Sequence, residues 1–386
     1  MFRLYDTRTK HVEAIKPGRG GLLRMFTCGP AGYRDAHVGD LRSYLLADLI
    51  RRNAEHRHRL TVLACQNISD VGRLARSREE AFRADCSALN LHPPQHSPRT
   101  SEGIGLMTGM ISSLIEAGHA YRAPGGCVYF DARSFPGYGE LSGNSGTGRS
   151  GSGGTQMRPE SGEPAGRRFR ADWALWEGAP AGRQPAWPAP WGAGLPGWPT
   201  ECSALSLHYL GDAIDLHAGG VDLCFPHHED ERAQSNSLAG HEVVRQWVHG
   251  GQVLFGGRRM AGPAGNMVLL SDLTDRGLDP LALRLAFLEH RYRQQVNLGW
   301  DTLSAADRAL RRWRQLVAEW ACSPSKPMTA AAEVAEAFDA DLDTPAALRV
   351  LRGLENDPQI APGSKFESFA HADQLLGLDL AREVGR

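Results

Sequence analysis

The first 65 residues alternate between strand-like and helix-like patterns, and this alternation constrains the fold more than any other feature. Residues 22–28 are apolar enough for a buried strand, and a turn punctuated by glycines follows over residues 29–40. Apolar residues then recur at three- and four-residue spacing from Leu41, as in an amphipathic helix, and residues 60–65 return to a strand pattern. This βαβ start predicts a parallel sheet that binds ligands at the carboxyl ends of its strands.

The length of 386 residues exceeds one compact core of ordinary size, so we expect two or three packed units. Hydrophobic residues at 41% and charged residues at 23% exclude a largely disordered or fibrous chain. No run approaches the roughly 18 consecutive apolar residues of a membrane span, and the N-terminus lacks a signal-peptide pattern. We therefore expect a cytoplasmic protein that makes no contact with membranes.

The seven cysteines are odd in number and widely spread, which is not typical of a disulfide framework. They indicate metal ligands or buried thiols.

The middle of the chain changes composition abruptly. Residues 103–118 have a helical pattern and residues 126–131 a strand pattern. In residues 142–167, 13 of 26 are Gly or Ser, which predicts a mobile loop because so few apolar side chains can be buried. A passage rich in Pro and Trp leads into a second strand-and-helix section over residues 214–255, where we expect the sheet to end.

The last third has helical patterns throughout. Asp279 followed by Pro280 is typical of a helix start, and further helices are expected from Ser304 and from Thr344. In the helix from Ser304, the residues expected to face inward are Leu310, Trp313, Val317 and Trp320, flanked by Arg308, Arg311, Arg312 and Arg314. We expect an α/β unit over residues 1–270, a helical bundle over 271–322 and a short helical tail over 323–386. The tail carries six Lys and Arg against eleven Asp and Glu, which does not favour nucleic-acid binding.

One cluster of residues has the chemistry of a metal site. His227 and Glu231 are four residues apart, so on a helix they project from one face and can reach a single ion. Cys28 closes the first strand, and Cys202 follows a turn formed by residues 198–201. These four side chains could hold zinc. The alternative is a surface helix with satisfied histidines and two buried cysteines.

Two further clusters suit a phosphate. His37, Gly39 and Asp40 lie between the first strand and its helix, where free backbone N–H groups and the helix dipole favour an anion. The alternative is a polar loop capped by Asp40. Residues 256–266 place glycines around paired arginines, and such a basic loop could close over an anion or could lie on the surface with no ligand.

In this order and at these separations, the clusters resemble the catalytic core of the cysteinyl-tRNA synthetase family, a class I aminoacyl-tRNA synthetase family. The resemblance covers roughly residues 2–320. It includes the strings Leu-Tyr-Asp-Thr near the start, Cys28-Gly29-Pro30, Asn67-Ile-Ser69-Asp70, Tyr138-Gly-Glu-Leu-Ser-Gly143, Trp198-Pro-Thr-Glu-Cys202, Asp215-Leu-His217-Ala-Gly-Gly220-Val-Asp222 and Phe-Pro-His227-His228-Glu-Asp-Glu231. It implies an α/β fold, with a Rossmann-like (HUP) parallel-sheet catalytic domain followed by a C-terminal helical bundle that contacts the tRNA stem.

The resemblance also implies roles for individual residues. The family's zinc ligands fall on Cys28, Cys202, His227 and Glu231, and its cysteine-binding residues on Ser69, Trp198 and His217. Its ATP-binding residues fall on Gly29, His37, Gly39, Gly220, Asp222, Arg259 and Met260, with His37, Asp40 and Arg259 as catalytic groups. The implied activity is the activation of L-cysteine to cysteinyl-adenylate with ATP and Mg²⁺, followed by transfer to the acceptor stem of tRNA(Cys).

The chain departs from the family's nucleotide motifs. Asp40 stands where the His-Ile-Gly-His signature has its second histidine, which brings a negative charge toward polyphosphate. In the Lys-Met-Ser-Lys-Ser loop, Arg259 stands for the first lysine and Gly262 for the second, and both serines are absent. Gly72 and Arg73 likewise replace part of the string that follows Asn-Ile-Thr-Asp. The loss of one transition-state contact costs about 10²–10³ in rate, so reduced activity is expected.

The chain ends at Arg386, where family members continue into an anticodon-binding module. We therefore expect a truncated, monomeric paralogue, related also to the shortened cysteine ligase of mycothiol synthesis. Two alternatives remain open at this point. One is a catalytically impaired cysteine- or nucleotide-binding protein. The other is a ligase that joins cysteine to a small amine, such as an amino sugar or a natural-product intermediate.

Overall fold

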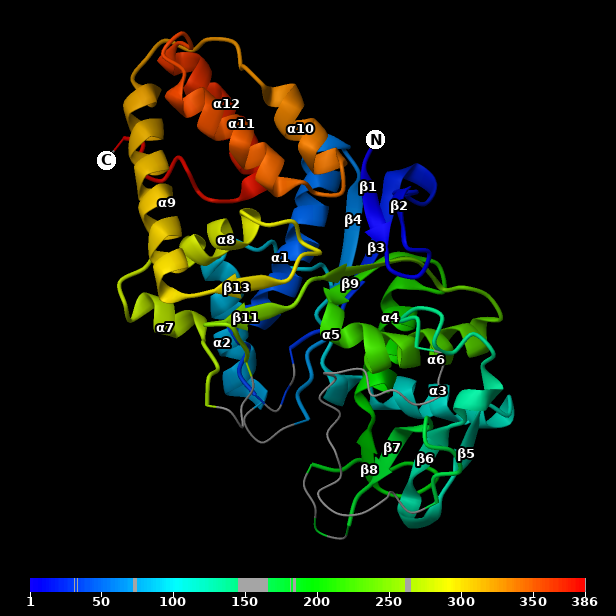
Figure 1. Ribbon diagram of the computed structural model, residues 1–386. Helices are drawn as coiled ribbons and strands as arrows, with labels where there is room; N and C mark the ends of the chain where they lie inside the picture. Colours follow the sequence, from blue (N-terminus) through cyan, green and yellow to red (C-terminus); the bar gives the residue numbers. More distant parts are fainter. Residues whose placement is uncertain are drawn as a thin grey trace.

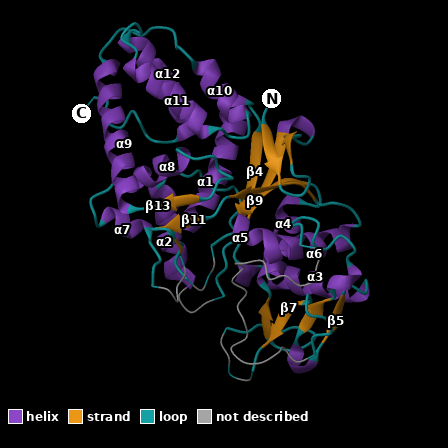
Figure 2. Cartoon of the chain, viewed as in Figure 1, coloured by secondary structure: helices purple, strands orange, loops and turns teal. Residues whose placement is uncertain are grey.

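The computed structural model describes residues 1–386 except 31, 33, 72–74, 145–165, 181, 183, 184, 261–264 and 386. A parallel α/β unit occupies the middle of the molecule (Figure 1). A smaller antiparallel sheet with helices lies on one side of it, and a helical region lies on the other (Figures 1 and 2). Among the described residues, no helix has both the length and the apolar composition needed to cross a membrane.

The central sheet has four parallel strands in the order β10-β9-β3-β4. Their bounds are Leu22–Thr27 (β3), Thr61–Gln66 (β4), Ile214–Gly220 (β9) and Val244–Gly250 (β10). The chain goes from β3 to β4 on one side, and β9 pairs with β3 on the other. The strand order therefore reverses between β3 and β9, and ligands of open α/β sheets bind at such a point.

The predicted βαβ start is confirmed. Helix α1 spans Val38–Arg52 and begins three residues before the expected Leu41, because His37 caps it. The ring of His37 accepts from the backbone N–H of Asp40 at 3.2 Å, and the Asp40 carboxylate accepts from the His37 N–H at 3.0 Å. A π-helical turn, Asn53–Arg57, then leads to β4. A short hairpin, β1 (Arg3–Asp6) with β2 (His11–Ala14), precedes this unit.

The segment between β4 and β9 holds the second sheet, which is antiparallel with the order β5-β6-β7-β8. Its elements are α2 (Ala75–Ala88), α3 (Ile104–Glu116), β5 (Ala120–Arg122), β6 (Val128–Phe130), β7 (Trp173–Gly178), β8 (Gly194–Pro196) and α4 (Trp198–Leu210). The predicted helix over 103–118 and strand over 126–131 are therefore confirmed as α3 and β6. Most of the loop predicted over 142–167 lies outside the described residues.

After β9 the chain returns to the central sheet and then becomes helical. The elements are α5 (Val221–Leu223), α6 (Glu229–Ala239), β11 (Val253–Phe255), β12 (Arg258–Arg259), α7 (Leu270–Thr274), α8 (Pro280–Leu288), β13 (Val296–Leu298), α9 (Trp300–Ala321), α10 (Ala331–Asp339), α11 (Thr344–Asn356) and α12 (Pro362–Leu376). Strands β11, β12 and β13 form a small sheet of their own.

The helix starts in this region follow local capping. Asp279 caps α8 by accepting from the Leu281 N–H at 2.9 Å, as its sequence predicts. Helix α9 begins at Trp300, so the start predicted at Ser304 is wrong by four residues. The predicted inward face of α9 is confirmed as buried. Arg314 was expected to flank that face, yet it is buried as well, because its guanidinium donates to Asp279 at 2.6 Å and to the carbonyls of Leu378 and Asp379.

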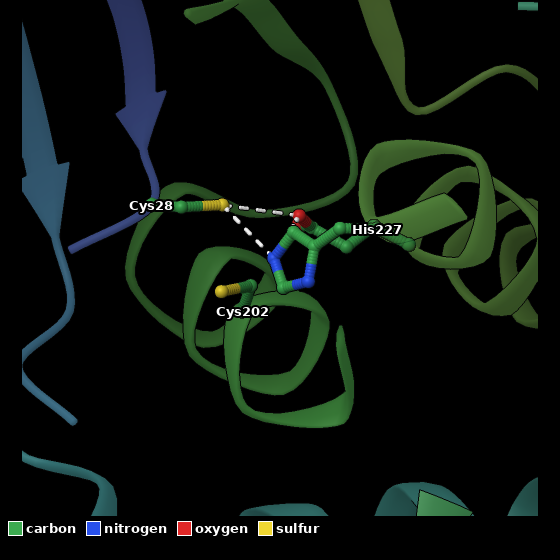
Figure 3. A group of neighbouring side chains, drawn as sticks. Cys28, Cys202 and His227 are labelled. Atoms are coloured by element: carbon green, nitrogen blue, oxygen red, sulfur yellow. Dashed lines mark hydrogen bonds and ion pairs between the residues drawn. The ribbon is translucent and has the colours of Figure 1, made fainter. Parts of the chain in front are cut away.

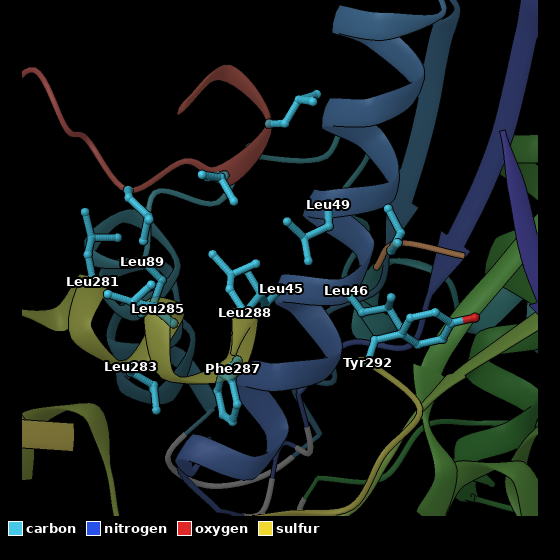
Figure 4. Packing of buried hydrophobic residues seen from close by; sticks show 14 of the residues in the cluster. Leu45, Leu46, Leu49, Leu89, Leu281, Leu283, Leu285, Phe287, Leu288 and Tyr292 are labelled. Atoms are coloured by element: carbon cyan, nitrogen blue, oxygen red, sulfur yellow. The ribbon is translucent and has the colours of Figure 1, made fainter. Parts of the chain in front are cut away.

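Leucines of α1 and α8 form the core between the sheet unit and the helical region (Figure 4). One fully buried arginine crosses this core: Arg284 on α8 donates to Asp48 on α1 at 2.7 Å and to the carbonyl of Leu376 at 2.5 Å. The same Asp48 carboxylate accepts from Arg52 at 2.7 Å. A buried charge needs such partners, and these contacts fix the position of α1. The N-terminus of α1 lies in the candidate site.

Candidate active site and metal centre

Four buried side chains meet at the carboxyl end of β3, and we call Cys28, Cys202, His227 and Glu231 the metal half of the site. Figure 3 shows three of them, Cys28, Cys202 and His227. One potential ligand atom from each lies within 4.8 Å of all the others. Cys28 Sγ lies 3.3 Å from His227 Nε2 and 3.1 Å from Glu231 Oε1. His227 Nε2 lies 3.1 Å from Glu231 Oε1, so the two side chains share one face, as their spacing predicts.

The four residues come from three separate places in the fold. Cys28 follows β3, as predicted. Cys202 lies in the first turns of helix α4, so the prediction of a turn over 198–201 is wrong: Gly197 and Pro199 begin a helix there. His227 belongs to a π-helical turn, Cys224–His228, that runs directly into α6 with Glu231. Sequence spacing alone cannot show that α4 and α6 bring their side chains to one point.

The electrostatics of the metal half suit a cation. Burial raises the pKa of the Cys28 thiol. Burial alone would lower the pKa of His227, but Cys202 and Glu231 outweigh it and raise this pKa to about 10. Burial would raise the pKa of Glu231, yet His217 and His227 hold it below its usual range. Two thiols, an imidazole and a carboxylate are ligands that zinc accepts, so the donor set fits this metal.

The residues predicted to bind cysteine lie beside this cluster. The Trp198 ring is 4.4 Å from that of His227, and His217 Nε2 is 3.5 Å from Cys28 Sγ. Ser69 follows β4 and is buried, in hydrogen-bond contact with Glu201. Trp198 and His217 thus contact the metal half directly, and Ser69 is connected to it through Glu201, the residue before Cys202.

Glu201 is a site residue that the sequence analysis missed. Its buried carboxylate accepts from Thr100 Oγ1 at 2.6 Å and supports Ser69. Burial raises the pKa of Glu201 to about 7, although the bonds from Thr100 and Ser69 oppose this. Its place directly before Cys202 was the available signal.

A second potential ligand set, also missed, shares Cys28 and Glu231 and adds His217 and His228. His228 is fully buried, and its Nε2 lies 3.5 Å from Cys28 Sγ and 4.0 Å from Glu231 Oε1. The sequence pattern predicts a ligand role for His227 and not for His228, because only His227 is four residues from Glu231.

A second group of residues, His37, Asp40, Asp222 and Arg259, interacts electrostatically near the N-terminus of α1, and we call it the nucleotide half. Burial lowers the pKa of His37, and its ring caps α1 as described above. Asp40 is held by two contacts: it completes the capping box, and Arg34 forms a bidentate ion pair with its carboxylate, with Nη2 at 2.9 Å from Oδ1 and Nη1 close to Oδ2. The negative charge of Asp40 therefore has a cation beside it.

The glycines predicted to bind ATP allow close approach between segments. A side chain on Gly39 would lie 2.9 Å from the His37 ring and 3.0 Å from Met260 Cε, so the helix N-terminus and the basic loop are in contact there. A side chain on Gly220 would lie 2.3 Å from Asp222 Oδ1. At Gly29 a Cβ would lie 1.6 Å from the carbonyl oxygen of Asn67. Packing of these two segments therefore requires glycine at this position.

Asp222 and Arg259 act on each other electrostatically. The carboxyl of Asp222 meets solvent but has protein on most sides, and this burial raises its pKa; Asp40 adds to the effect, and Arg259 opposes it. Arg259 itself is exposed on β12. Ala261 and Gly262, which depart from the Lys-Met-Ser-Lys-Ser motif, lie outside the described residues. Gly72 and Arg73 lie outside them as well.

The chain is similar to one known protein family and to its members. The family model described as "tRNA synthetases class I (C) catalytic domain" matches residues 14–308. The cysteine–tRNA ligase of Opitutus terrae is 36% identical over a 405-residue alignment that covers 98% of this chain and 86% of the relative. That of Salinibacter ruber is 38% identical, covering 81% of this chain and 68% of the relative.

Solved structures agree on the fold. The Agrobacterium radiobacter K84 agnB2 LeuRS superimposes with a TM-score of 0.68 at 11% identity, covering 94% of this chain and 84% of that one. The methionyl-tRNA synthetase of Mycobacterium tuberculosis gives 0.58 at 14% identity, covering 94% and 90%. The expected class I architecture is thereby confirmed. With a family model over most of its length and relatives of this identity, the chain belongs to the cysteinyl-tRNA synthetase family.

Proposed function

We propose that the chain activates L-cysteine with ATP and transfers the cysteinyl group to tRNA, with zinc held by Cys28, Cys202, His227 and Glu231. The observation that supports this most is the convergence of these four buried ligand groups at the strand-order switch of a class I synthetase fold. The names of the relatives give no support to the two alternatives, a silent binding protein and a ligase for small amines.

The metal half would select the amino acid. A zinc ion bound there would ligate a cysteine thiol in preference to a serine hydroxyl, since zinc favours soft thiolates. A pocket that relied on size alone would separate such similar side chains by only about 1–3 kcal/mol. Trp198 and Ser69 would close this pocket around the substrate, with Glu201 fixing the orientation of the Ser69 hydroxyl.

The nucleotide half would position ATP for attack. The cysteine carboxylate forms a bond to the α-phosphorus, the bond from that phosphorus to its bridging oxygen breaks, and pyrophosphate leaves with the electron pair. A terminal tRNA hydroxyl then attacks the cysteinyl carbonyl, and AMP leaves. His37 at the α1 N-terminus and Arg259 would donate to the phosphate oxygens, and Gly39 leaves the backbone accessible.

The test is ATP–pyrophosphate exchange on the zinc-loaded chain, followed by charging of total tRNA with labelled cysteine. We expect exchange that depends on cysteine and that is not supported by serine, and cysteine recovered on tRNA. The same chain stripped of metal is the control. Exchange no faster than that of the stripped chain would contradict activation, and adenylate formation without charged tRNA would contradict the proposed acceptor.

A further inference from the structure

A line of hydrogen-bonded side chains connects the N-terminal hairpin to the thiol of Cys28. Thr7 Oγ1, just after β1, lies 2.7 Å from His249 Nδ1 on β10. His249 Nε2 lies 2.8 Å from His228 Nδ1. His228 Nε2 faces Cys28 Sγ at 3.5 Å. Three consecutive contacts thus separate a surface turn from the metal half.

The backbone fixes the position of the Thr7 hydroxyl. The Thr7 N–H donates to the carbonyl of Trp247 at 2.8 Å, and the Trp247 N–H donates to Asp6 Oδ1 at 3.0 Å. The Arg8 N–H donates to the same carboxylate oxygen at 3.1 Å. The turn that carries Thr7 is therefore attached to the same strand as His249.

The two histidine rings have little freedom. Both are buried, and the His228 ring fills a space that a side chain on Gly219 would obstruct, since its Cβ would lie 2.7 Å from the ring. Each ring nitrogen faces one partner, and the contact between His249 Nε2 and His228 Nδ1 is a single hydrogen bond, in which one ring donates and the other accepts.

The hydrogen bonds along this line can therefore point in only two directions, toward Cys28 or toward Thr7. If Thr7 donates to His249 Nδ1, both rings carry their proton on Nε2, and the His228 N–H points at the sulfur of Cys28. If His249 donates to Thr7, both rings carry their proton on Nδ1, and a lone pair of His228 faces that sulfur. A metal ligand is a thiolate, which attracts an N–H and repels a lone pair. The first direction therefore stabilises the metal-bound form.

We propose that Thr7 is a positioning residue whose hydroxyl donates to His249 and so directs the His228 N–H toward the Cys28 thiolate. This inference deepens the proposed function, because it rests on the metal half holding a metal. An N–H donor draws electron density from the sulfur, so the hydroxyl of a residue three contacts away would tune the metal–thiolate bond.

The experiment compares Thr7→Val with Thr7→Ser in the full chain loaded with Co²⁺, whose thiolate charge-transfer band reports the electron density on sulfur. Valine keeps the shape of threonine and removes the hydroxyl, whereas serine keeps the hydroxyl. We expect Thr7→Val to shift the band and to weaken metal binding about tenfold, the lower end for groups behind a ligand. Thr7→Ser should resemble the wild type.

A matched control lies on the same hairpin. Thr9 Oγ1 donates to Glu13 Oε1 at 2.6 Å, outside this line, so Thr9→Val removes a hydroxyl without reaching the site and should leave the band unchanged. An unchanged band in Thr7→Val, equal shifts in Thr7→Val and Thr9→Val, or a wild-type chain that binds no Co²⁺ would overturn the proposal.

A second measurement needs no variant. In the metal-loaded wild type, ¹⁵N-histidine spectra should show His228 and His249 as Nε2–H tautomers, and two Nδ1–H tautomers would overturn the proposal. Neither measurement uses ATP or tRNA. A chain that failed in pyrophosphate exchange could therefore still confirm the role of Thr7, and an active chain could still refute it.

Discussion

The metal half and the nucleotide half differ in burial and in how far their side chains are engaged by neighbouring residues. All four residues of the metal half are buried, with at most 6% of their surface exposed. They offer their ligand atoms to one common point. In the nucleotide half, Asp222 and Arg259 are exposed, and Asp40 is occupied by a helix cap and an ion pair.

The comparison shows that the type of a residue and the charge of a residue predict its function to different extents. A buried thiol beside an imidazole has few functions other than metal binding or packing. A carboxylate at a helix N-terminus can bond to many kinds of partner. Its effect on ATP binding depends on which partner lies beside it. With Arg34 beside Asp40, the replacement of a histidine by an aspartate changes the local net charge less than the sequence suggests.

The largest effect is expected from loss of a ligand in the metal half. Cys202→Ala should lower zinc affinity by more than about 100-fold, because even groups behind a ligand contribute about 10–100-fold, and cysteine-dependent exchange should disappear. Zinc affinity is measured by competition with a chromogenic chelator.

Cys65→Ala is the matched control for this variant. Cys65 is equally buried in β4 and belongs to the same apolar cluster, but it is in neither potential ligand set. It should keep wild-type zinc affinity. Equal affinity in both variants would show that the metal half does not use Cys202.

The next effect concerns the nucleotide half. Arg259→Gln should slow exchange by about 10²–10³, the usual consequence of removing one group that stabilises transition-state charge. Cysteine and zinc binding, measured calorimetrically without ATP, should not change, since Arg259 is exposed and belongs to neither potential ligand set.

Arg258 provides the control for Arg259, because both arginines are exposed on β12. Arg258→Gln should have little effect if the position of the cation matters. If the two variants slowed exchange equally, the loop would act only through its overall positive charge, and the assignment of Arg259 would be wrong.

The sequence predicted the elements of the catalytic unit well, because their signals are local. Hydrophobic runs identified β3 and β4, and the Asp279-Pro280 cap identified α8. The start of α9 was misplaced by four residues, since Gly299 has no capping side chain to mark it. Arg314 was misjudged because its partners, Leu378 and Asp379, are more than 60 residues away in the chain.

The site was predicted where motifs fixed residue types and missed where contacts are indirect. Cys28, Cys202, His227 and Glu231 were singled out by residue chemistry and spacing and assigned as ligands by resemblance, and the structure brings them together. Glu201, His249 and Thr7 were not, since each acts through another residue, and no spacing rule links Thr7 to a strand more than 230 residues later. Such contacts depend on the register of β10 against β9 and on the turn after β1.

The smallest effect tests whether Arg34 offsets the charge of Asp40. Arg34→Gln leaves the carboxylate without its bidentate partner and should raise the KM for ATP by about three- to tenfold, equivalent to about 1 kcal/mol for a partly exposed pair. Asp40→Asn leaves the cation and keeps an oxygen that can accept from the His37 N–H, so the helix cap survives. It should leave the KM for ATP unchanged or lower it.

The double variant Arg34→Gln/Asp40→Asn separates charge from structure. If charge dominates, removing both charges restores a KM close to that of the wild type, because neither group is left unbalanced. If the ion pair instead holds the turn in place, both single variants raise the KM to a similar extent and the double variant does not recover. In that case the substitution of Asp40 for a histidine would be a structural adaptation of the α1 N-terminus, and the two halves of the site would differ less than their charges indicate.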